Sequence, residues 1–323
     1  GLLLRHQQRR PRRYETSPSW HVARGWLRRW ESMERDRGPR PDRSPPAVLV
    51  RARGEVAGRP VMSSCNHNRQ CHVSEAFVAE QAQWLHVFID VAPDVSEESA
   101  SFWSAVLDWP VGEPWPGHPE FRSFIPPNGD TYIHQQIGDH GPRVHFDLEV
   151  PDRGFADRLV RLGAVITGYG DGWCPMRSPG GLPFCLIDRV DHVRPSAQRF
   201  AQHRARLVQI CIDSPSKLHD QEVAFWQQAT GWRWRAGTSD EFAGKLYPPT
   251  DSSAQLLLQR LGSDDPATAV RAHIDLGADD IAAEAERLVG LGAKRLGPGR
   301  GWIVLRDPVG MVFCVTGNSP NDP

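Results

Sequence analysis

The feature that most constrains this chain is an internal repeat, in which the pattern of residues 81–190 recurs in residues 204–318. Seven segments match in the same order, and Trp103 corresponds to Trp226 at a spacing of 123 residues. The matched segments include RLVRLGA with RLVGLGA, VHFDLEV with AHIDLGA, and FCLID with FCVTG. Ordered matches at a nearly constant offset indicate that one folding unit was duplicated.

A second, weaker period lies inside each copy. The segment LHVFIDVAP resembles VHFDLEVPD 59 residues further on, and both alternate apolar and polar residues as half-buried strands do. Each is followed by an amphipathic helix pattern and then by three short strand patterns. We therefore predict an α+β fold of tandem domains, each built from two β-α-β-β-β units. Because one unit cannot cover its own sheet, two units should form a curved mixed sheet around a cleft.

Charge divides the chain near residue 80. Residues 1–80 contain 16 Arg and 8 acidic residues, so they carry a net charge of +8, whereas the remainder carries −9. Such an Arg- and Pro-rich segment cannot bury enough apolar surface to offset the entropy lost on ordering. We predict a basic, disordered tail over 1–80, domains over 81–190 and 204–318, and a linker over 191–203.

The tail allows two functional interpretations. Arg side chains with interleaved Trp suit phosphate contacts and base stacking, but the composition is more typical of a solvated segment, so we expect no nucleic-acid partner. The segment CNHNRQCH at 65–72 offers zinc-ligand atoms, in a spacing that matches no usual zinc motif.

The apolar runs and the cysteines of the chain restrict the partners and the location that we expect. No apolar run approaches the roughly 20 residues that a membrane span requires, so we expect no membrane partner. Six cysteines in 323 residues do not form a disulfide framework. We expect a cytoplasmic protein that acts as a monomer or a homodimer.

The repeated segments resemble the vicinal oxygen chelate superfamily, which includes glyoxalase I, bleomycin-resistance proteins and extradiol dioxygenases. The marks are ICIDSP with FWQQATGW, AHIDLGADD with RLVGLGA, and LRDPVGMVFCVTG. The resemblance covers residues 81–318 and is strongest to glyoxalase-like domains of the actinobacterial type. It implies the fold more specifically than the function, because the superfamily contains isomerases, dioxygenases and binding proteins without catalysis.

The resemblance also implies where ligands would lie, on the first and last strands of each unit. Enzymes of the superfamily mostly have His, Gln or Glu at these positions, with a Glu on the last strand. Here that position is a cysteine in both copies, which argues against an iron dioxygenase or an isomerase with a carboxylate base. The corresponding residues are His86, Gln135, His145 and Cys185 in the first copy, and Gln209, Gln259, His273 and Cys314 in the second.

We therefore expect a small-molecule-binding or resistance-type protein with an aromatic-lined cleft and no cofactor. The candidate cleft residues are His86, Gln135, His145, Trp173, Gln209, Gln259, His273 and Trp302. Trp173 and Trp302 are matched positions that suit either ligand stacking or core packing. The alternative is a metal-dependent lyase, isomerase or dioxygenase acting in the first copy. Its single zinc would be held by His86, His145, Gln135 and Cys185, because zinc accepts imidazole and thiolate ligands.

Overall fold

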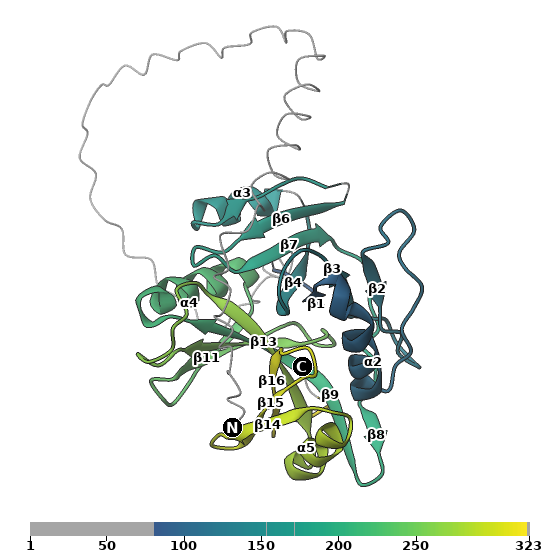
Figure 1. The fold of residues 1–323 in the computed structure, drawn as a ribbon. Helices are drawn as coiled ribbons and strands as arrows, with labels where there is room; N and C mark the ends of the chain where they lie inside the picture. The colour runs from purple at the N-terminus through teal and green to yellow at the C-terminus, as the bar shows by residue number, and fades with distance from the viewer. Residues whose placement is uncertain (1–80, 153, 171, 322–323) are drawn as a thin grey trace, which may run out of the picture. The chain divides into compact units, whose positions relative to one another are not determined.

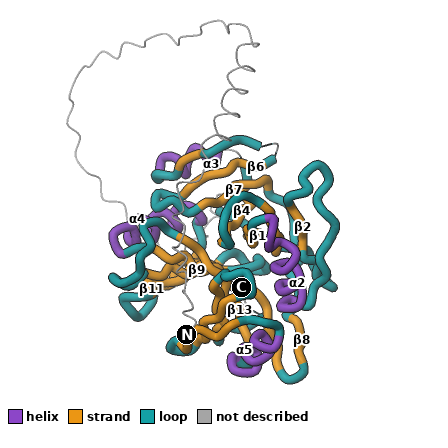
Figure 2. The backbone as a smooth tube through the Cα atoms, viewed as in Figure 1, coloured by secondary structure: helices purple, strands orange, loops and turns teal. Residues whose placement is uncertain are grey.

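The computed structural model describes residues 81–152, 154–170 and 172–321. The predicted tail, including the CNHNRQCH segment, lies outside the described residues. All described residues belong to one compact unit, Val73–Pro323. Strands form most of its regular structure, and helices α2 to α5 lie against the sheets (Figure 2).

The first copy forms a seven-stranded sheet in the order β2-β3-β1-β4-β7-β6-β5 (Figure 1). A short 3-10 turn, Pro93–Val95, leads from its first strand into its first helix. The elements are β1 Leu85–Val91, α2 Ser96–Leu107, β2 Phe121–Ser123, β3 Ile133–Ile137, β4 Arg143–Val150, α3 Gly154–Arg161, β5 Val165–Ile166, β6 Trp173–Arg177 and β7 Pro183–Asp188.

The second copy forms a nine-stranded sheet in the order β10-β11-β12-β9-β13-β16-β15-β14, with β8 paired to β9. Its elements are β8 Gln198–Phe200, β9 His203–Ser214, α4 Ser216–Thr230, β10 Arg233–Ala236, β11 Phe242–Tyr247, β12 Gln255–Arg260, β13 Arg271–Ala278, α5 Ile281–Gly290, β14 Lys294–Pro298, β15 Trp302–Arg306 and β16 Val312–Thr316.

This architecture confirms the predicted α+β fold and the unit within each copy. The first strands of the two units pair antiparallel at the centre of each sheet, β1 with β4 and β9 with β13. The last strand of each unit returns parallel to its first strand. One departure occurs in the first unit, where the expected second strand is reduced to an isolated bridge between Val111 and Phe124.

Two helices pack on the sheet of the other copy rather than only on their own. Trp103 of α2 lies 5.2 Å, ring centre to ring centre, from Phe313 of β16. Trp226 of α4 lies 5.1 Å from Phe184 of β7. Both indoles are fully buried. The two matched tryptophans therefore occupy like environments, and each helix bridges the copies.

Carboxylates complete these two contacts. The indole N–H of Trp103 donates to Asp307 Oδ2 at 3.1 Å, and that of Trp226 donates to Glu222 Oε2 at 2.8 Å. Glu222 Oε1 also accepts from the backbone N–H of Gly180, in the turn before β7, at 2.6 Å. Each tryptophan is thus tied to the turn that precedes the last strand of the opposite copy.

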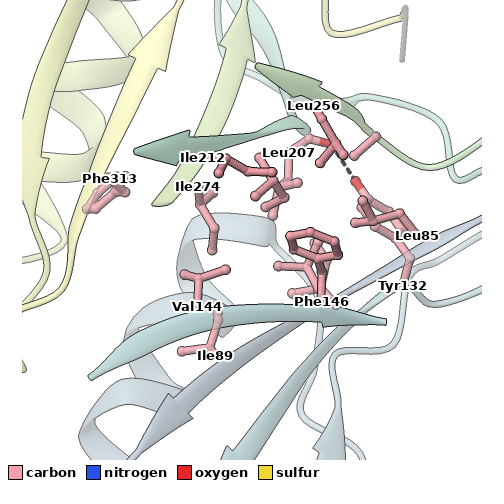
Figure 3. Packing of buried hydrophobic residues seen from close by; sticks show 14 of the residues in the cluster. Leu85, Ile89, Tyr132, Val144, Phe146, Leu207, Ile212, Leu256, Ile274 and Phe313 are labelled. Atoms are coloured by element: carbon pink, nitrogen blue, oxygen red, sulfur yellow. Dashed lines mark hydrogen bonds between the residues drawn. The ribbon is translucent and has the colours of Figure 1, made fainter. Parts of the chain in front are cut away.

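The two sheets share one hydrophobic core, in which alternate residues of the central strands meet. The Tyr132 hydroxyl crosses this core and donates to the carbonyl of Leu207 at 2.7 Å. Since side chains alternate along a strand, the other face of each sheet points away from the shared core. Figure 3 shows, on the first-copy side, Leu85, Ile89, Val144 and Phe146, and on the second-copy side, Leu207, Ile212, Leu256 and Ile274.

Candidate functional site

Each copy presents a pair of a buried aspartate and a histidine on the sheet face that points away from the core. In the first copy, Nδ1 of His145 lies 2.7 Å from Asp90 Oδ1. In the second, Nδ1 of His273 lies 2.9 Å from Asp213 Oδ2. The aspartates stand on β1 and β9, and the histidines stand on the neighbouring strands β4 and β13. Sequence reasoning missed both aspartates, although they occupy matched positions in FIDV and CIDS.

The same geometry places an arginine and a second aspartate at each pair. Arg143 Nε donates to Asp90 at 2.8 Å, and Arg271 Nε lies 3.4 Å from Asp213. On the other side of the second imidazole, His273 Nε2 lies 3.3 Å from Asp275 Oδ1. Each histidine is therefore oriented through Nδ1 and directs Nε2 towards a second acidic group.

Acidic neighbours control the protonation of these histidines. Burial alone would lower the pKa of His145, but the charge and hydrogen bond of Asp90 raise it above its ordinary value. Burial alone would also lower the pKa of His273, but Asp213, Cys211 and Asp275 together raise it well above its ordinary value. Both imidazoles are thus stabilised in the protonated form.

This protonation predicts a pH-dependent contribution to stability. A histidine whose pKa is raised on folding stabilises fully below its unfolded pKa of about 6.5 and loses that contribution as pH rises through the folded pKa. The difference in unfolding free energy between the wild type and His273→Gln should therefore shrink over the pH range that begins near the unfolded pKa of about 6.5 and extends upward through the raised folded pKa. Urea unfolding at a series of pH values measures it. A difference that stays constant across this range would contradict the protonated pair.

A cavity of about 1060 Å³ opens over the pair of the second copy. Four predicted cleft residues line it, namely Gln209, Gln259, His273 and Trp302. Most other lining residues come from β9, β11, β12, β13, β15 and β16 and from the turns beside β16, so the cavity lies over the face of this sheet that points away from the core. They include Cys211, Asp213, Phe242, Lys245, Tyr247, Leu257, Arg271, Asp275, Met311, Cys314 and Asn318. Pro142 and Arg143 of the first copy also line the cavity.

In the first copy, an aromatic ring stands where the second copy has a thiol. Phe88 corresponds to Cys211, and its ring stacks on His145 with centres 4.7 Å apart and planes 13° apart. His134 of β3 lies against the other side of this cluster, 4.8 Å from Phe88. Phe88 and His134 are both nearly inaccessible, at 4 % exposure. The cleft position above His145 is therefore filled by protein side chains.

The register of the sheet corrects one predicted residue. Gln259 pairs with Asp213, and Gln136 pairs with Asp90, so Gln136 rather than Gln135 is the counterpart of Gln259. Gln135 lies on the core side, where its amide donates to a backbone carbonyl of α2 at 2.9 Å. A shift of one residue exchanges the two faces of a strand. The prediction that Gln135 lines the cleft or binds metal is therefore wrong.

The two matched tryptophans of the predicted clefts differ in their surroundings. Trp302 lines the second-copy cavity and meets Phe242 edge to face at 5.4 Å. Trp173 is 38 % exposed on β6 and meets His118 edge to face at 5.4 Å. Only Trp302 of this pair is therefore placed beside the large cavity.

Within the described residues, metal-ligand atoms come within 4.8 Å of one another in two groups. Neither group contains the predicted combination of His86, His145, Gln135 and Cys185, because His145 lies against Asp90 and His86 lies beside other ligands. These groups do not support the expectation of a protein without metal. They are His86 with Glu149 and His192 in the first copy, and Cys211 with His273 and Asp275 in the second.

Both last-strand cysteines are free thiols, of which Cys314 is buried and Cys185 is half-buried. Burial and the nearby Asp147 raise the pKa of Cys185 far above its ordinary value. Burial also raises the pKa of Cys314, although its neighbour His273 opposes this shift. The Sγ of Cys314 lies 3.6 Å from His273 Nε2.

Both polar groups of the Gln209 side chain are hydrogen-bonded. Its amide N–H donates to Asp275, and its oxygen accepts from Gln255 at 2.8 Å.

Comparisons with solved structures give the same fold. The manganese(II)-bound glyoxalase from Novosphingobium aromaticivorans is 18 % identical, with a TM-score of 0.52 over 75 % of this chain and 84 % of the other. The 2,2',3-trihydroxybiphenyl 1,2-dioxygenase from dibenzofuran-degrading Sphingomonas wittichii is 11 % identical, with a TM-score of 0.50 over 74 % and 93 %. The 2,3-dioxygenase LapB from Pseudomonas is 12 % identical, with a TM-score of 0.50 over 74 % and 93 %. At these identities the likeness shows the fold alone.

The sequence comparison identifies the family. No curated protein sequence matches the chain. In the described part of the chain, no helix has the length and apolarity to cross a bilayer. The model of the glyoxalase-like domain matches twice, over residues 86–187 and residues 209–316. These two matches cover most of the chain and coincide with the two sheets, so the chain belongs to the glyoxalase-like domain family, within the vicinal oxygen chelate superfamily.

Proposed function

We propose that this protein binds a small molecule and that the ligand occupies the cavity of the second copy. The observation that carries the proposal is the cavity of about 1060 Å³ over the His273–Asp213 pair. Cavities of roughly 300–1,000 Å³ with a few convergent polar groups are typical of sites for drug-sized ligands. The ligand-binding site then lies in the second copy. The first copy would support it structurally, because protein side chains fill the position above His145.

The charges of the cavity favour an anionic ligand. Its lining contains four Arg or Lys residues and three Asp residues. Arg271 is neutralised by Asp265 at 2.8 Å and by Asp213, whereas the Lys245 ammonium donates to the neutral amide of Asn318 at 2.7 Å. Burial lowers the pKa of Lys245, although Asp275 opposes that shift. A carboxylate, phenolate or sulfonate group would therefore supply the close counter-ion that Lys245 lacks among the described residues.

Aromatic and apolar walls favour a planar ligand body. Trp302 and Phe242 form one edge-to-face pair at the cavity. Tyr247 also lines it and is held by Arg233, whose guanidinium lies 4.5 Å from the ring centre. Rings fixed in this way offer flat apolar surface at little entropic cost. We infer a ligand class of partly aromatic anions.

Anilinonaphthalenesulfonate tests this inference because it is anionic, aromatic and fluorescent when bound. The wild-type chain should bind one equivalent, and Lys245→Met should weaken binding by about tenfold or more, since a hydrogen bond to a charged group contributes about 1.5–3 kcal/mol. Lys294→Met is the matched control, because Lys294 is exposed on β14 and does not line the cavity. Equal affinities of the wild type and Lys245→Met would contradict the proposed site.

A second candidate is a metal-dependent enzyme that uses the same cavity. It is favoured by the grouping of Cys211, His273 and Asp275, with Asp213 bonded to the other imidazole nitrogen of His273. Histidine ligands of metals usually donate their second N–H to a carboxylate in this way. The thiol, imidazole and carboxylate fit zinc, which would supply Lewis-acid polarisation of a bound oxygen. Stoichiometric metal that is lost in His273→Ala and retained in His145→Ala would favour this candidate over binding alone.

The remaining sequence predictions stay proposals. They comprise domain limits at 81–190 and 204–318, a linker at 191–203, a cytoplasmic location, and a monomer or homodimer. The actinobacterial type of the domains also stays a prediction.

A further inference from the structure

Three metal-ligating side chains converge in the first copy, away from the cavity of the second. His86 Nε2 lies 3.0 Å from Glu149 Oε1, and His192 Nε2 lies 2.6 Å from the same oxygen. His86 comes from β1, Glu149 from β4, and His192 from the connection between β7 and β8. All three ligand atoms lie within 4.8 Å of one another. Two imidazoles and one carboxylate therefore direct their ligand atoms into the same small region.

His86 and Glu149 each have a second hydrogen-bond partner on the side away from the cluster, and His192 has an acidic neighbour there. His86 Nδ1 lies 3.0 Å from His134 Nε2. Glu149 Oε2 accepts from the backbone N–H of Val190 at 3.1 Å. His192 Nδ1 lies 3.7 Å from Asp130 Oδ2. Outer partners of this kind orient metal-binding histidines and carboxylates and fix their tautomers.

The hydrogen bonds behind His86 allow a metal to bind without leaving a buried nitrogen unpaired. His134 Nδ1 lies 2.9 Å from the Ser123 hydroxyl, so His134 can either donate to His86 or accept from it. When His86 donates through Nδ1, its Nε2 presents a lone pair towards Glu149.

The site is nearly closed to solvent. The side chain of Glu149 is 2 % exposed, and those of His86 and His192 are each 12 % exposed. Burial would raise the pKa of Glu149, but the hydrogen bonds from the two histidines and Val190 hold it below its ordinary value. The ring of Trp84 stacks on His192 at 4.5 Å and covers the cluster on that side.

We propose that His86, Glu149 and His192 bind one divalent metal ion, with zinc preferred, and that this ion fastens the connection between the two copies to the first sheet. Imidazole nitrogen and carboxylate oxygen are ordinary zinc ligands, and a water molecule would complete four-coordination. The site does not use Gln135, His145 or Cys185, the other first-copy residues that the superfamily resemblance assigned.

A structural role follows from the position of His192. Its neighbour Val193 exchanges two hydrogen bonds with Asp130, one through the Asp130 carboxylate and one through the Asp130 backbone N–H, both at 2.7 Å. The backbone N–H of Ser196 donates to the Asn128 side chain at 2.8 Å. The connection thus already runs along the loop before β3, and a metal at His192 would add a third attachment to the same sheet.

Titration of the full chain, prepared without a metal-affinity step, with Zn²⁺ and with Co²⁺ tests the proposal. The wild type should take up one equivalent at this site, and Zn²⁺ should raise its melting temperature. His192→Ala should weaken that uptake by about 10-fold or more, by comparison with the 10–100-fold losses seen for outer-shell changes. Glu149→Gln should do the same. His118→Ala is the matched control, since His118 forms an exposed pair with Glu120 at 3.4 Å.

Cobalt distinguishes this site from the cysteine-containing group of the second copy. Binding at His86, Glu149 and His192 gives visible ligand-field bands without a thiolate charge-transfer band, and these bands should persist in Cys211→Ser and His273→Ala. Zinc uptake that is unchanged in both His192→Ala and Glu149→Gln would overturn the proposal. So would the absence of any thiolate-free cobalt spectrum in the wild type. Neither result bears on ligand binding in the second-copy cavity, so failure of one proposal is distinguishable from failure of the other.

Discussion

Replacing Trp226 by alanine is expected to lower the free energy of unfolding by about 3–5 kcal/mol, the usual cost of truncating a buried Trp or Phe. The indole is fully buried, packs on Phe146 and Phe184 of the first copy, and donates to Glu222. Its removal would leave a cavity at the contact between the copies and deprive the buried Glu222 of a donor. Urea unfolding followed by circular dichroism measures the change.

Two further variants show whether the contact between copies is the cause. Trp103→Ala should have a cost similar to that of Trp226→Ala, because Trp103 makes the equivalent contact with Phe313. Trp173→Ala should cost less than about 1 kcal/mol, since Trp173 is 38 % exposed on a strand near the sheet edge. A small effect at both Trp103 and Trp226 would contradict the cross-packing of α2 and α4.

Replacing Cys211 by phenylalanine is expected to weaken the binding of anilinonaphthalenesulfonate strongly. Cys211 lines the cavity and corresponds to Phe88, whose ring stacks on His145 in the first copy. A phenylalanine at this position would stack over His273 and fill the floor of the cavity, so the second copy would acquire the filled arrangement of the first. The affinity should fall by at least about tenfold, equivalent to about 1.4 kcal/mol. Fluorescence titration measures the loss.

The control for this prediction removes the thiol without filling the space. Cys211→Ala should retain binding within a few-fold, because the thiol is assigned no contact with the ligand. Both variants should unfold cooperatively, with Cys211→Phe less stable by about 1–3 kcal/mol if the ring is overpacked. Retained affinity in a folded Cys211→Phe chain would show that the ligand lies elsewhere.

The sequence predicted the fold well because the evidence for it is repeated. Alternation along LHVFIDV and VHFDLEV, followed by helical spacing, recurs in four units, so an error in one segment is corrected by the others. It did not predict that α2 and α4 pack across the copies. The spacing of apolar residues shows which face of each helix carries Trp103 or Trp226. It does not show which of the two sheets covers that face.

The site was predicted less well, for physical reasons that differ from residue to residue. His273, Gln209, Gln259 and Trp302 do line the large cavity. Gln135 was misplaced because a match between segments does not fix strand register, and one residue decides the face. The cleft position of the first copy is filled by the ring of Phe88, which stacks on His145. The sequence alone does not show this contact.

Other site residues carried no sufficient signal in the sequence. Asp90 and Asp213 match between copies, but only strand pairing shows that each faces a histidine. His192 lies in a connection without a counterpart in the repeat, so nothing in the pattern linked it to His86 and Glu149. Such sites form from segments that are distant in sequence, and their ligands become recognisable only after the chain is folded.

The most direct test of the account is backbone hydrogen exchange measured with and without saturating anilinonaphthalenesulfonate. Slowed exchange should be confined to the strands lining the second-copy cavity, chiefly β11, β12, β15 and β16. Strands β2, β3, β6 and β7 of the first copy should exchange at unchanged rates. Slowed exchange in those first-copy strands, with none in β11 or β15, would contradict the claim that the second copy holds the ligand.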